Sequence, residues 1–314
     1  MHSQTPARQY KHIFTLNIYT LLYMRSYITL ITLLLISAAS ASASQPIFEH
    51  ARYNNEQSDT AQITKTLDSV SAIRLSSQGD IVAESAKAFV GKPYAENTLE
   101  GAPEMLTVNT DQLDYITLVQ NAVALAISID ENRCSWPDFI FNLKRIRYRG
   151  GSVEGYTSRL HYISDWAVDN IHRGILKNAT YDFPRYASAT RSLDYMSQNA
   201  DKFPALSDSA TVARIKEIEN GYKGYRFPYI KPIDLSNKEV KAEFRNGDIL
   251  AFVSKEKNLD YSHMGILIIG DDGEMRVLHA SSQAGKVVIS DLSLADFMKR
   301  NRQYLGISVF RLVE

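Results

Sequence analysis

Two histidines near the C-terminus are the residues best suited to chemistry. His263 opens one β-like run, SHMGILIIG, and His279 lies late in the next, EMRVLHASS. If residues 271–273 form a three-residue hairpin loop with a left-handed Gly273, the register places Gly265 opposite His279. His263 then shares the face of Gly265, so the two imidazoles are diagonal neighbours. A loop one residue longer would place them on opposite faces.

Two imidazoles on one face of a sheet have three interpretations. They can be the base and the orienting residue of a nucleophilic triad, two ligands of a metal ion, or structural histidines with satisfied hydrogen bonds. A zinc site needs a third ligand. His161 and Asp165 are four residues apart on a predicted helix and could supply one, although no HExxH-like pattern is present. These residues by themselves leave the three interpretations open.

A nucleophile for such a triad would belong at the N-terminus of a helix, where the helix dipole favours an anion. The apolar run at 113–129 predicts a helix buried almost all round,. We expect Asp111 to be its N-cap and Asp114 to occupy its third position. The exposed first turn, residues 112–115, ends in Tyr115 and is the natural place for the nucleophile.

The elements that position these residues change in character along the chain. Helical patterns come first, at 79–90, 113–129, 136–148, 159–171 and 208–219,. Short β-like runs separated by turn residues follow, at 248–254, 262–270, 274–281, 286–290 and 306–312,. Helices followed by a small antiparallel sheet predict an α+β architecture, with residues 44–314 as a single domain.

Composition excludes several classes of protein. Lys+Arg and Asp+Glu number 35 each, which is not the basic excess of a nucleic-acid-binding protein. The basic run at 144–149 is expected to be a solvated face. Cys134 is the one cysteine, so no disulfide can form within the chain,. We expect it to be a buried, unreactive thiol.

The N-terminal residues resemble a secretory signal peptide. Met24-Arg25 gives a positive start, residues 27–36 are apolar, and small residues with A-x-A sites follow up to Ala43,. This pattern predicts a signal peptide over residues 1–43, with Met24 as an alternative start, and a periplasmic or secreted mature protein. The alternative is an uncleaved membrane anchor, but the apolar run is short for a span. We therefore expect no stable membrane anchor after cleavage.

An ordered set of segments between residues 80 and 312 resembles the N-acetylmuramoyl-L-alanine amidase-like family, a branch of the NlpC-type papain-like superfamily of bacterial cell envelopes. The most specific segment is GYTSRLHYISDWAVDN (155–170). The others are GKPY (91–94), TLE (98–100), LDYITLVQNAVALA (113–126), LKRIRYRGG (143–151), NGDILAFVS (246–254), YSHMGI (261–266), LHASS (278–282) and KVVISDLSL (286–294).

The resemblance implies a papain-like core, in which a buried nucleophile-bearing helix packs on a C-terminal antiparallel sheet with extra helices around it. The family's base histidine maps onto His263 and its orienting residue onto His279. Its nucleophilic cysteine, in an LDCxT pattern, maps onto Tyr115, so this sequence departs from the family at the reacting atom. No metal ligand and no cofactor are implied.

The resemblance also implies a substrate cleft for peptidoglycan fragments, the muropeptides, lined by Arg159, His161, Tyr162 and Glu100. The alternative for the first three is packing, with Arg159 in an ion pair. Glu100 could instead cap the loop before the helix at 113–129.

A phenol in place of the thiol changes the expected activity. Its ordinary pKa is near 10, against about 8.5 for a thiol, so ionisation costs about 2 kcal/mol more. We therefore predict an amidase scaffold without cysteine-based amide hydrolysis. The alternatives are a pseudoenzyme that binds muropeptides or a partner protein, and a metal-dependent hydrolase that uses His263 and His279.

Overall fold

The computed structural model describes residues 51–313, so the predicted signal peptide and the alternative start at Met24 lie outside the described residues. The α-helices of this part are α2 (Glu56–Ser71), α3 (Gln78–Lys87), α4 (Tyr115–Asp130), α5 (Trp136–Arg147), α6 (Ile163–His172), α7 (Tyr195–Gln198), α8 (Ser209–Gly221), α9 (Lys238–Glu243) and α10 (Leu294–Arg300). Within residues 51–313, none of the helices combines the length and the apolar character needed to cross a bilayer.

A six-stranded antiparallel sheet forms the C-terminal half, as the short β-like runs predict. Its strand order is β3-β10-β6-β7-β8-β9. The strands are β3 (Leu176–Asn178), β6 (Ile249–Ser254), β7 (Tyr261–Ile269), β8 (Met275–Ser281), β9 (Lys286–Ile289) and β10 (Tyr304–Leu312). The edge strand β3 was not predicted, because three residues with one buried side chain give no alternation to detect,.

The hairpin between β7 and β8 has the predicted register. Ile266 lies opposite Leu278, and the Gly270 amide donates to the Glu274 carbonyl over 3.0 Å. Gly273 is left-handed, with φ of +73°, as a three-residue loop requires. At Gly265 a Cβ atom would lie 2.7 Å from Val277 and 2.8 Å from the Leu278 carbonyl, so only glycine fits beside the histidines.

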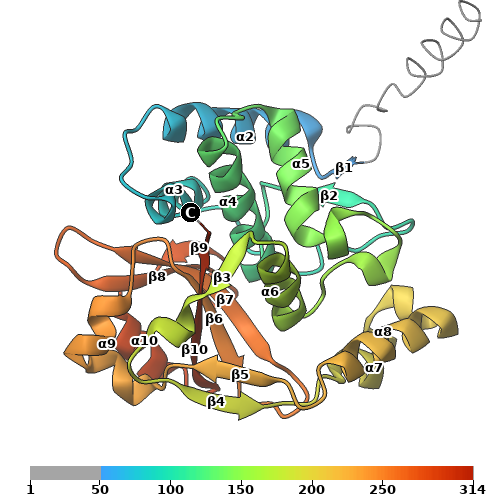
Figure 1. Cartoon of the computed structure of the whole chain (residues 1–314). Helices are drawn as coiled ribbons and strands as arrows, with labels where there is room; N and C mark the ends of the chain where they lie inside the picture. Colours follow the sequence, from blue (N-terminus) through green and yellow to red (C-terminus); the bar gives the residue numbers. More distant parts are fainter. Residues whose placement is uncertain (1–50, 314) are drawn as a thin grey trace, which may run out of the picture. The chain divides into compact units, whose positions relative to one another are not determined.

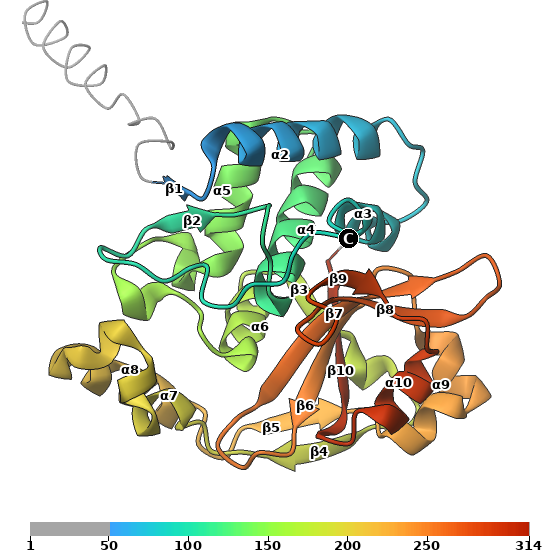
Figure 2. The same cartoon turned by 180° about the vertical axis from the view of Figure 1, so that it is seen from behind.

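Apolar side chains cover both faces of this sheet. On one face, α3 and α4 pack in a large core that includes Ile249, Met264 and Leu278. On the other, α9 and α10 pack on a second cluster that includes Phe252 and Val277. Figures 1 and 2 show the helices α2–α5 gathered on one side of the sheet and α9 and α10 on the other. This arrangement is an α+β fold, as the sequence predicts.

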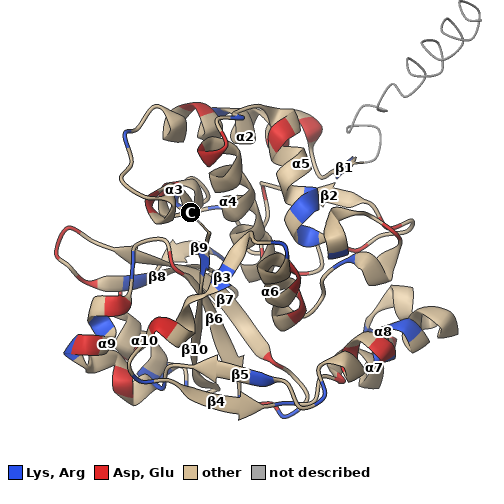
Figure 3. Cartoon of the chain, viewed as in Figure 1, with Lys and Arg blue, Asp and Glu red and all other residues tan. Residues whose placement is uncertain are grey.

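Two smaller sheets and a helical arm complete the described part. β1 (Ala51–Tyr53) pairs with β2 (Leu106–Val108) in parallel, and β4 (Ala187–Thr190) pairs with β5 (Arg226–Tyr229) in antiparallel fashion. Both views place α7 and α8 at the periphery, beyond β4 and β5. Figure 3 shows both acidic and basic residues on α8, α9 and α10.

Three sequence predictions about local structure were wrong. The helix expected at 159–171 begins at Ile163, because Arg159 is drawn into a bridge with Tyr148. Arg147, inside a run expected to be solvated, is only 1% exposed. Cys134, expected to be buried, is exposed. It follows the C-terminal end of α4, about 24 Å along the helix from Tyr115, and so it cannot replace the nucleophile.

Candidate active site

The helix that carries Tyr115 begins later than predicted. Asp114, not Asp111, is the N-cap of α4, and Tyr115 is its first residue. Thr117 decides this boundary, because its amide donates to Asp114 Oδ1 over 2.7 Å and its hydroxyl accepts from the Asp114 amide over 2.9 Å, closing a capping box,. The side chain at 115 therefore leaves the first turn of the helix.

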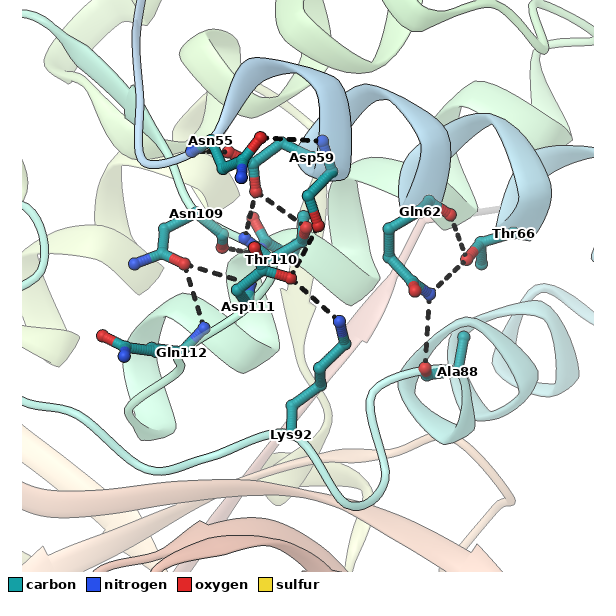
Figure 4. Close-up of polar contacts among 12 residues, drawn as sticks. Asn55, Asp59, Gln62, Thr66, Ala88, Lys92, Asn109, Thr110, Asp111 and Gln112 are labelled. Atoms are coloured by element: carbon teal, nitrogen blue, oxygen red, sulfur yellow. Dashed lines mark hydrogen bonds and ion pairs between the residues drawn. The ribbon is translucent and has the colours of Figure 1, made fainter.

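Residues of α2 fix the chain that leads into α4 (Figure 4). The fully buried Asp59 accepts from the Thr110 amide over 2.7 Å and from the Thr110 hydroxyl over 2.8 Å. Asp111 accepts from Ser58 and is paired with Lys92 at 3.0 Å. These contacts occupy the carboxylate that was predicted to cap the helix, and they hold the turn before it.

His263 and His279 lie together on the face of the sheet that bears Val277. His263 Nε2 and His279 Nδ1 are 2.9 Å apart in a hydrogen bond, and their rings meet at an angle of 85°. Because that bond occupies Nε2 of His263, its Nδ1 is the nitrogen available to another group. If Nε2 is the donor, Nδ1 is an unprotonated base, which is the tautomer that a triad needs.

Tyr115 lies against this histidine pair. The centroids of the Tyr115 and His263 rings are 5.0 Å apart. Burial raises the pKa of Tyr115 well above its usual range, and the neighbouring Asp114 carboxylate adds to the shift. Burial lowers the pKa of His263 to about 3, with a further contribution from His279, and lowers that of His279 to about 4. The phenol and both imidazoles are therefore neutral near pH 7.

Aromatic rings pack against both histidines. Phe252 and Tyr304 lie 5.5 and 6.3 Å from His263, centroid to centroid, and Tyr304 is stacked on it at 10°. Phe297 of α10 lies 5.2 Å from His279. This packing leaves each histidine 9% exposed and so lowers the pKa of both, because it removes most of the water that would solvate an imidazolium.

A cleft of about 970 Å³ opens onto Tyr115, His263 and His279. Its other walls come from β8, β9, α10 and the segment around Tyr94, and they carry many uncharged polar side chains. Those side chains are Ser262, Ser281, Ser282, Gln283, Ser290, Asn301 and Gln303. A space of this size with such walls can hold a drug-sized polar ligand. We call it the cleft.

The predicted substrate-binding residues lie on the other flank of the α4 N-terminus. Glu100, Arg159 and His161 line a separate space of about 110 Å³, together with Asp114 and Arg147. We call this space the pocket. Asp114 borders the pocket and Tyr115 the cleft, so the first residues of α4 separate the two.

Arg159 and Tyr162 are already engaged within the protein. Arg159 is 5% exposed and pairs with Glu100 at 2.7 Å and with Glu104 at 3.4 Å. Tyr162 is buried, and its hydroxyl donates to Glu219 over 2.7 Å, away from the cleft. The ion pair that was the alternative for Arg159 is therefore present, and Tyr162 contributes to packing.

His161 does not join the histidine pair. Its Nε2 is hydrogen bonded to the Tyr156 carbonyl at 2.8 Å, and burial lowers its pKa to about 3. Asp165, the other candidate third metal ligand, accepts from Arg149 over 2.9 Å and from Tyr222 over 2.7 Å. Across residues 51–313, no group of three or more His, Cys, Asp or Glu is placed to hold a metal ion.

Several residues at the site were not predicted. Tyr304 and Phe297 come from segments that carry no motif, and only the fold brings them to the histidines. Gln120 and Arg147 lie inside segments that were matched to the family. Gln120 is one polar residue in a helix predicted to be apolar, and Arg147 is one of several charges in a basic run, so neither was distinguished from its neighbours. Asp260 was also missed: it directly precedes β7, and its carboxylate accepts from the Ser164 amide over 2.7 Å, so it caps the first turn of α6,.

Fold and site together define a class of protein. A buried helix packs on an antiparallel sheet, its first residue faces a histidine, and a second histidine orients the first. This arrangement is that of an α+β, papain-like core.

Comparisons with known proteins give the family. The model of the N-acetylmuramoyl-L-alanine amidase-like family matches residues 84–307. The chain belongs to this family. Among curated proteins, none matches it.

Solved structures agree on the fold. An N-acetylmuramoyl-L-alanine amidase from Bacteroides uniformis is 33% identical, with a TM-score of 0.71 over 76% of this chain and 99% of its own. A Bacteroides fragilis protein named as a xylanase is 36% identical, with a TM-score of 0.67 over 72% and 99% of the two chains. The Legionella pneumophila protein LPG0564, 23% identical, has a TM-score of 0.64 over 82% and 96% and shares the fold.

Proposed function

We propose that this protein binds muropeptides in an amidase scaffold and does not perform cysteine-type amide hydrolysis. Family membership and the B. uniformis amidase support the peptidoglycan ligand. The carrying observation is the partly buried, neutral phenol of Tyr115 against His263, where an active relative would have its thiol.

The chemistry at this position supports the loss of hydrolysis. Attack on an amide carbonyl needs an anionic or partly deprotonated nucleophile, with His263 as the base and His279 holding its tautomer. Burial and the Asp114 carboxylate both oppose ionisation of the phenol. The ring also fills space beside the histidine that the carbonyl of a substrate would need.

The other parts of the proposal follow from the sequence. The segment over residues 1–43 supports export, with a periplasmic or secreted mature protein that keeps no membrane anchor,. The metal-dependent alternative gains no support among residues 51–313, since the facing nitrogens of His263 and His279 bind each other.

Two measurements on the purified mature chain test the proposal. Calorimetric titration with N-acetylmuramoyl-L-alanyl-D-glutamate should give saturable binding, and chromatography of the mixture should show no free L-alanyl-D-glutamate. Release of the dipeptide would contradict the proposal that the protein does not hydrolyse the amide. Absence of binding would contradict the proposal that its ligand is a muropeptide.

A further inference from the structure

Arg147 is an unusual charge because it is buried without an acid to pair with. It ends α5, is 1% exposed, and donates from Nε to Gln120 Oε1 over 2.7 Å and from Nη1 to the Thr107 carbonyl. Within residues 51–313, no carboxylate is in ion-pair contact with it, and Nη2 has no acceptor. A buried guanidinium normally has a paired anion, because desolvating an isolated charge is expensive.

The neighbours of Arg147 add further unused donors. Arginine can only donate, so the contact with Arg147 fixes the Gln120 amide with its oxygen toward the guanidinium and its NH₂ group away from it. That NH₂ group has no acceptor among the residues described. The Thr98 hydroxyl is buried and has no partner there either. Arg147, Gln120 and Thr98 all line the pocket.

The acids of the pocket are occupied by other groups. Glu100 is bound to Arg159 at 2.7 Å, and Asp114 Oδ1 accepts from the amide and the hydroxyl of Thr117. Burial raises the pKa of Asp114, while the hydrogen bonds from Thr117 and the charge of Arg147 act in the opposite direction. The pocket thus combines unused donors with a guanidinium that makes no direct ion pair, because Asp114 and Glu104 act on Arg147 only at longer range.

We propose that Arg147, Gln120 and Thr98 bind a carboxylate group of the ligand in the pocket, on the opposite flank of α4 from the cleft. A space of about 110 Å³ accepts a carboxylate and the atoms next to it, but not a sugar ring. A guanidinium matches the two oxygens of a carboxylate in one plane. Only the identification of the ligand as a muropeptide rests on the proposed function.

Gln120→Glu is the sharpest test, because it keeps the hydrogen bond to Arg147 and turns it into an internal ion pair. The variant should fold with an equal or higher melting temperature. It should bind N-acetylmuramoyl-L-alanyl-D-glutamate about tenfold more weakly in calorimetry, since a charge-assisted hydrogen bond is lost. Gln112→Glu, at an exposed position just before α4, adds the same charge outside the pocket and should bind like the unmodified chain.

Two further probes separate this inference from the proposed function. The diamide of the same muropeptide, which lacks both carboxylates, should bind about tenfold more weakly to the unmodified chain and no differently to Gln120→Glu. N-acetyl-D-glutamate, followed by NMR titration, supplies the carboxylate without the sugar and should bind to the unmodified chain only.

The outcomes are distinct. Equal binding of diacid and diamide, or full affinity in Gln120→Glu, overturns the carboxylate site and leaves the muropeptide proposal standing. A third outcome is that N-acetyl-D-glutamate binds to the unmodified chain and not to Gln120→Glu, while the muropeptide binds to neither. This outcome supports the carboxylate site and overturns the proposed function. Absence of binding by all three probes overturns both.

Discussion

The two flanks of the α4 N-terminus meet at the neighbouring residues Asp114 and Tyr115 but differ in chemistry. On the cleft side, a phenol that resists ionisation lies 5.0 Å from a neutral histidine. On the pocket side, Arg147 remains charged and without an acid partner, although burial lowers its pKa to about 10. Under the proposed function, the cleft side has an unreactive residue at position 115, and the pocket side keeps strong donors. The contrast then teaches that recognition and reaction can be separated by one side chain.

Restoring a thiol on the cleft side should give the largest effect. Tyr115→Cys removes the ring, returns an ionisable group to the helix N-terminus, and leaves the hydrogen bond between His263 and His279 unchanged. Release of L-alanyl-D-glutamate from the muropeptide should rise on the order of 100-fold or more above the unmodified chain. Chromatography of timed reactions measures it.

The exposed Cys134 makes a matched background necessary for that experiment. Tyr115→Cys should be active with Cys134→Ser, inactivated by iodoacetamide, and inactive when His263→Ala is added. If the restored thiol stays inert although the chain is folded, the cleft has changed beyond position 115 and the contrast between the flanks is wrong.

Loss of Asp59 should weaken both flanks together, because its carboxylate fixes the turn that precedes α4. Asp59→Ala leaves the Thr110 amide and the Asn55 amide, 3.0 Å away, without their acceptor. The free energy of unfolding should fall by roughly 3 kcal/mol in urea denaturation. Asp68→Ala, an exposed acid on the same helix, should change it by less than about 0.5 kcal/mol. Equal effects would show that the turn is held by other contacts.

Buried histidines on both flanks should make stability depend on pH. The pKa is about 3 for His263 and His161 in the folded chain, against 6.5 for an ordinary histidine. As the pH falls below about 6.5, the unfolded chain binds protons that the folded chain does not, so stability is lost on acidification. Each histidine can contribute up to roughly 2 kcal/mol between about pH 7 and pH 5.

Two single variants divide this pH dependence between the flanks. His263→Asn should remove the contribution of the cleft histidine to the stability loss between about pH 7 and pH 5, and His161→Asn should remove that of the pocket histidine. Urea denaturation of each variant at both pH values measures the free energy of unfolding. An unchanged slope in either variant would mean that the pKa of that histidine is the same in the folded and unfolded chains.

The helix cap between the flanks should have the smallest effect. Asp114→Ala removes the acceptor of the Thr117 amide and should lower the free energy of unfolding by about 1 kcal/mol. Asp208→Ala removes the corresponding acceptor, bonded to the Thr211 amide over 2.8 Å, at the start of α8, and serves as the matched cap. A much larger loss at Asp114 would show that this carboxylate also stabilises Arg147 across the pocket.

The sequence determined the α+β class, the main helices, the strands after residue 248, and the register of the β7–β8 hairpin; it did not predict β1 to β5, which lie among the helices. Local chemistry carries these features: hydrophobic period, turn residues and the left-handed Gly273. The same register placed His263 beside His279, and the family motifs placed Tyr115 across from them. The helix start was misplaced because Asp111 and Asp114 are equally good caps by type. The capping box between Asp114 and Thr117, and the contacts of Asp111 with Ser58 and Lys92, decide between them.

Only the tertiary structure decided what each polar side chain is free to do. Arg159 and Tyr162 matched the family motif as well as any residue, yet Glu100, Glu104 and Glu219 already engage them. Arg147 belonged to an ordinary basic run and proved to be buried and unpaired by acids. Whether a charged side chain already has an ion-pair partner depends on residues tens of positions away in the chain. A local sequence pattern does not identify those partners.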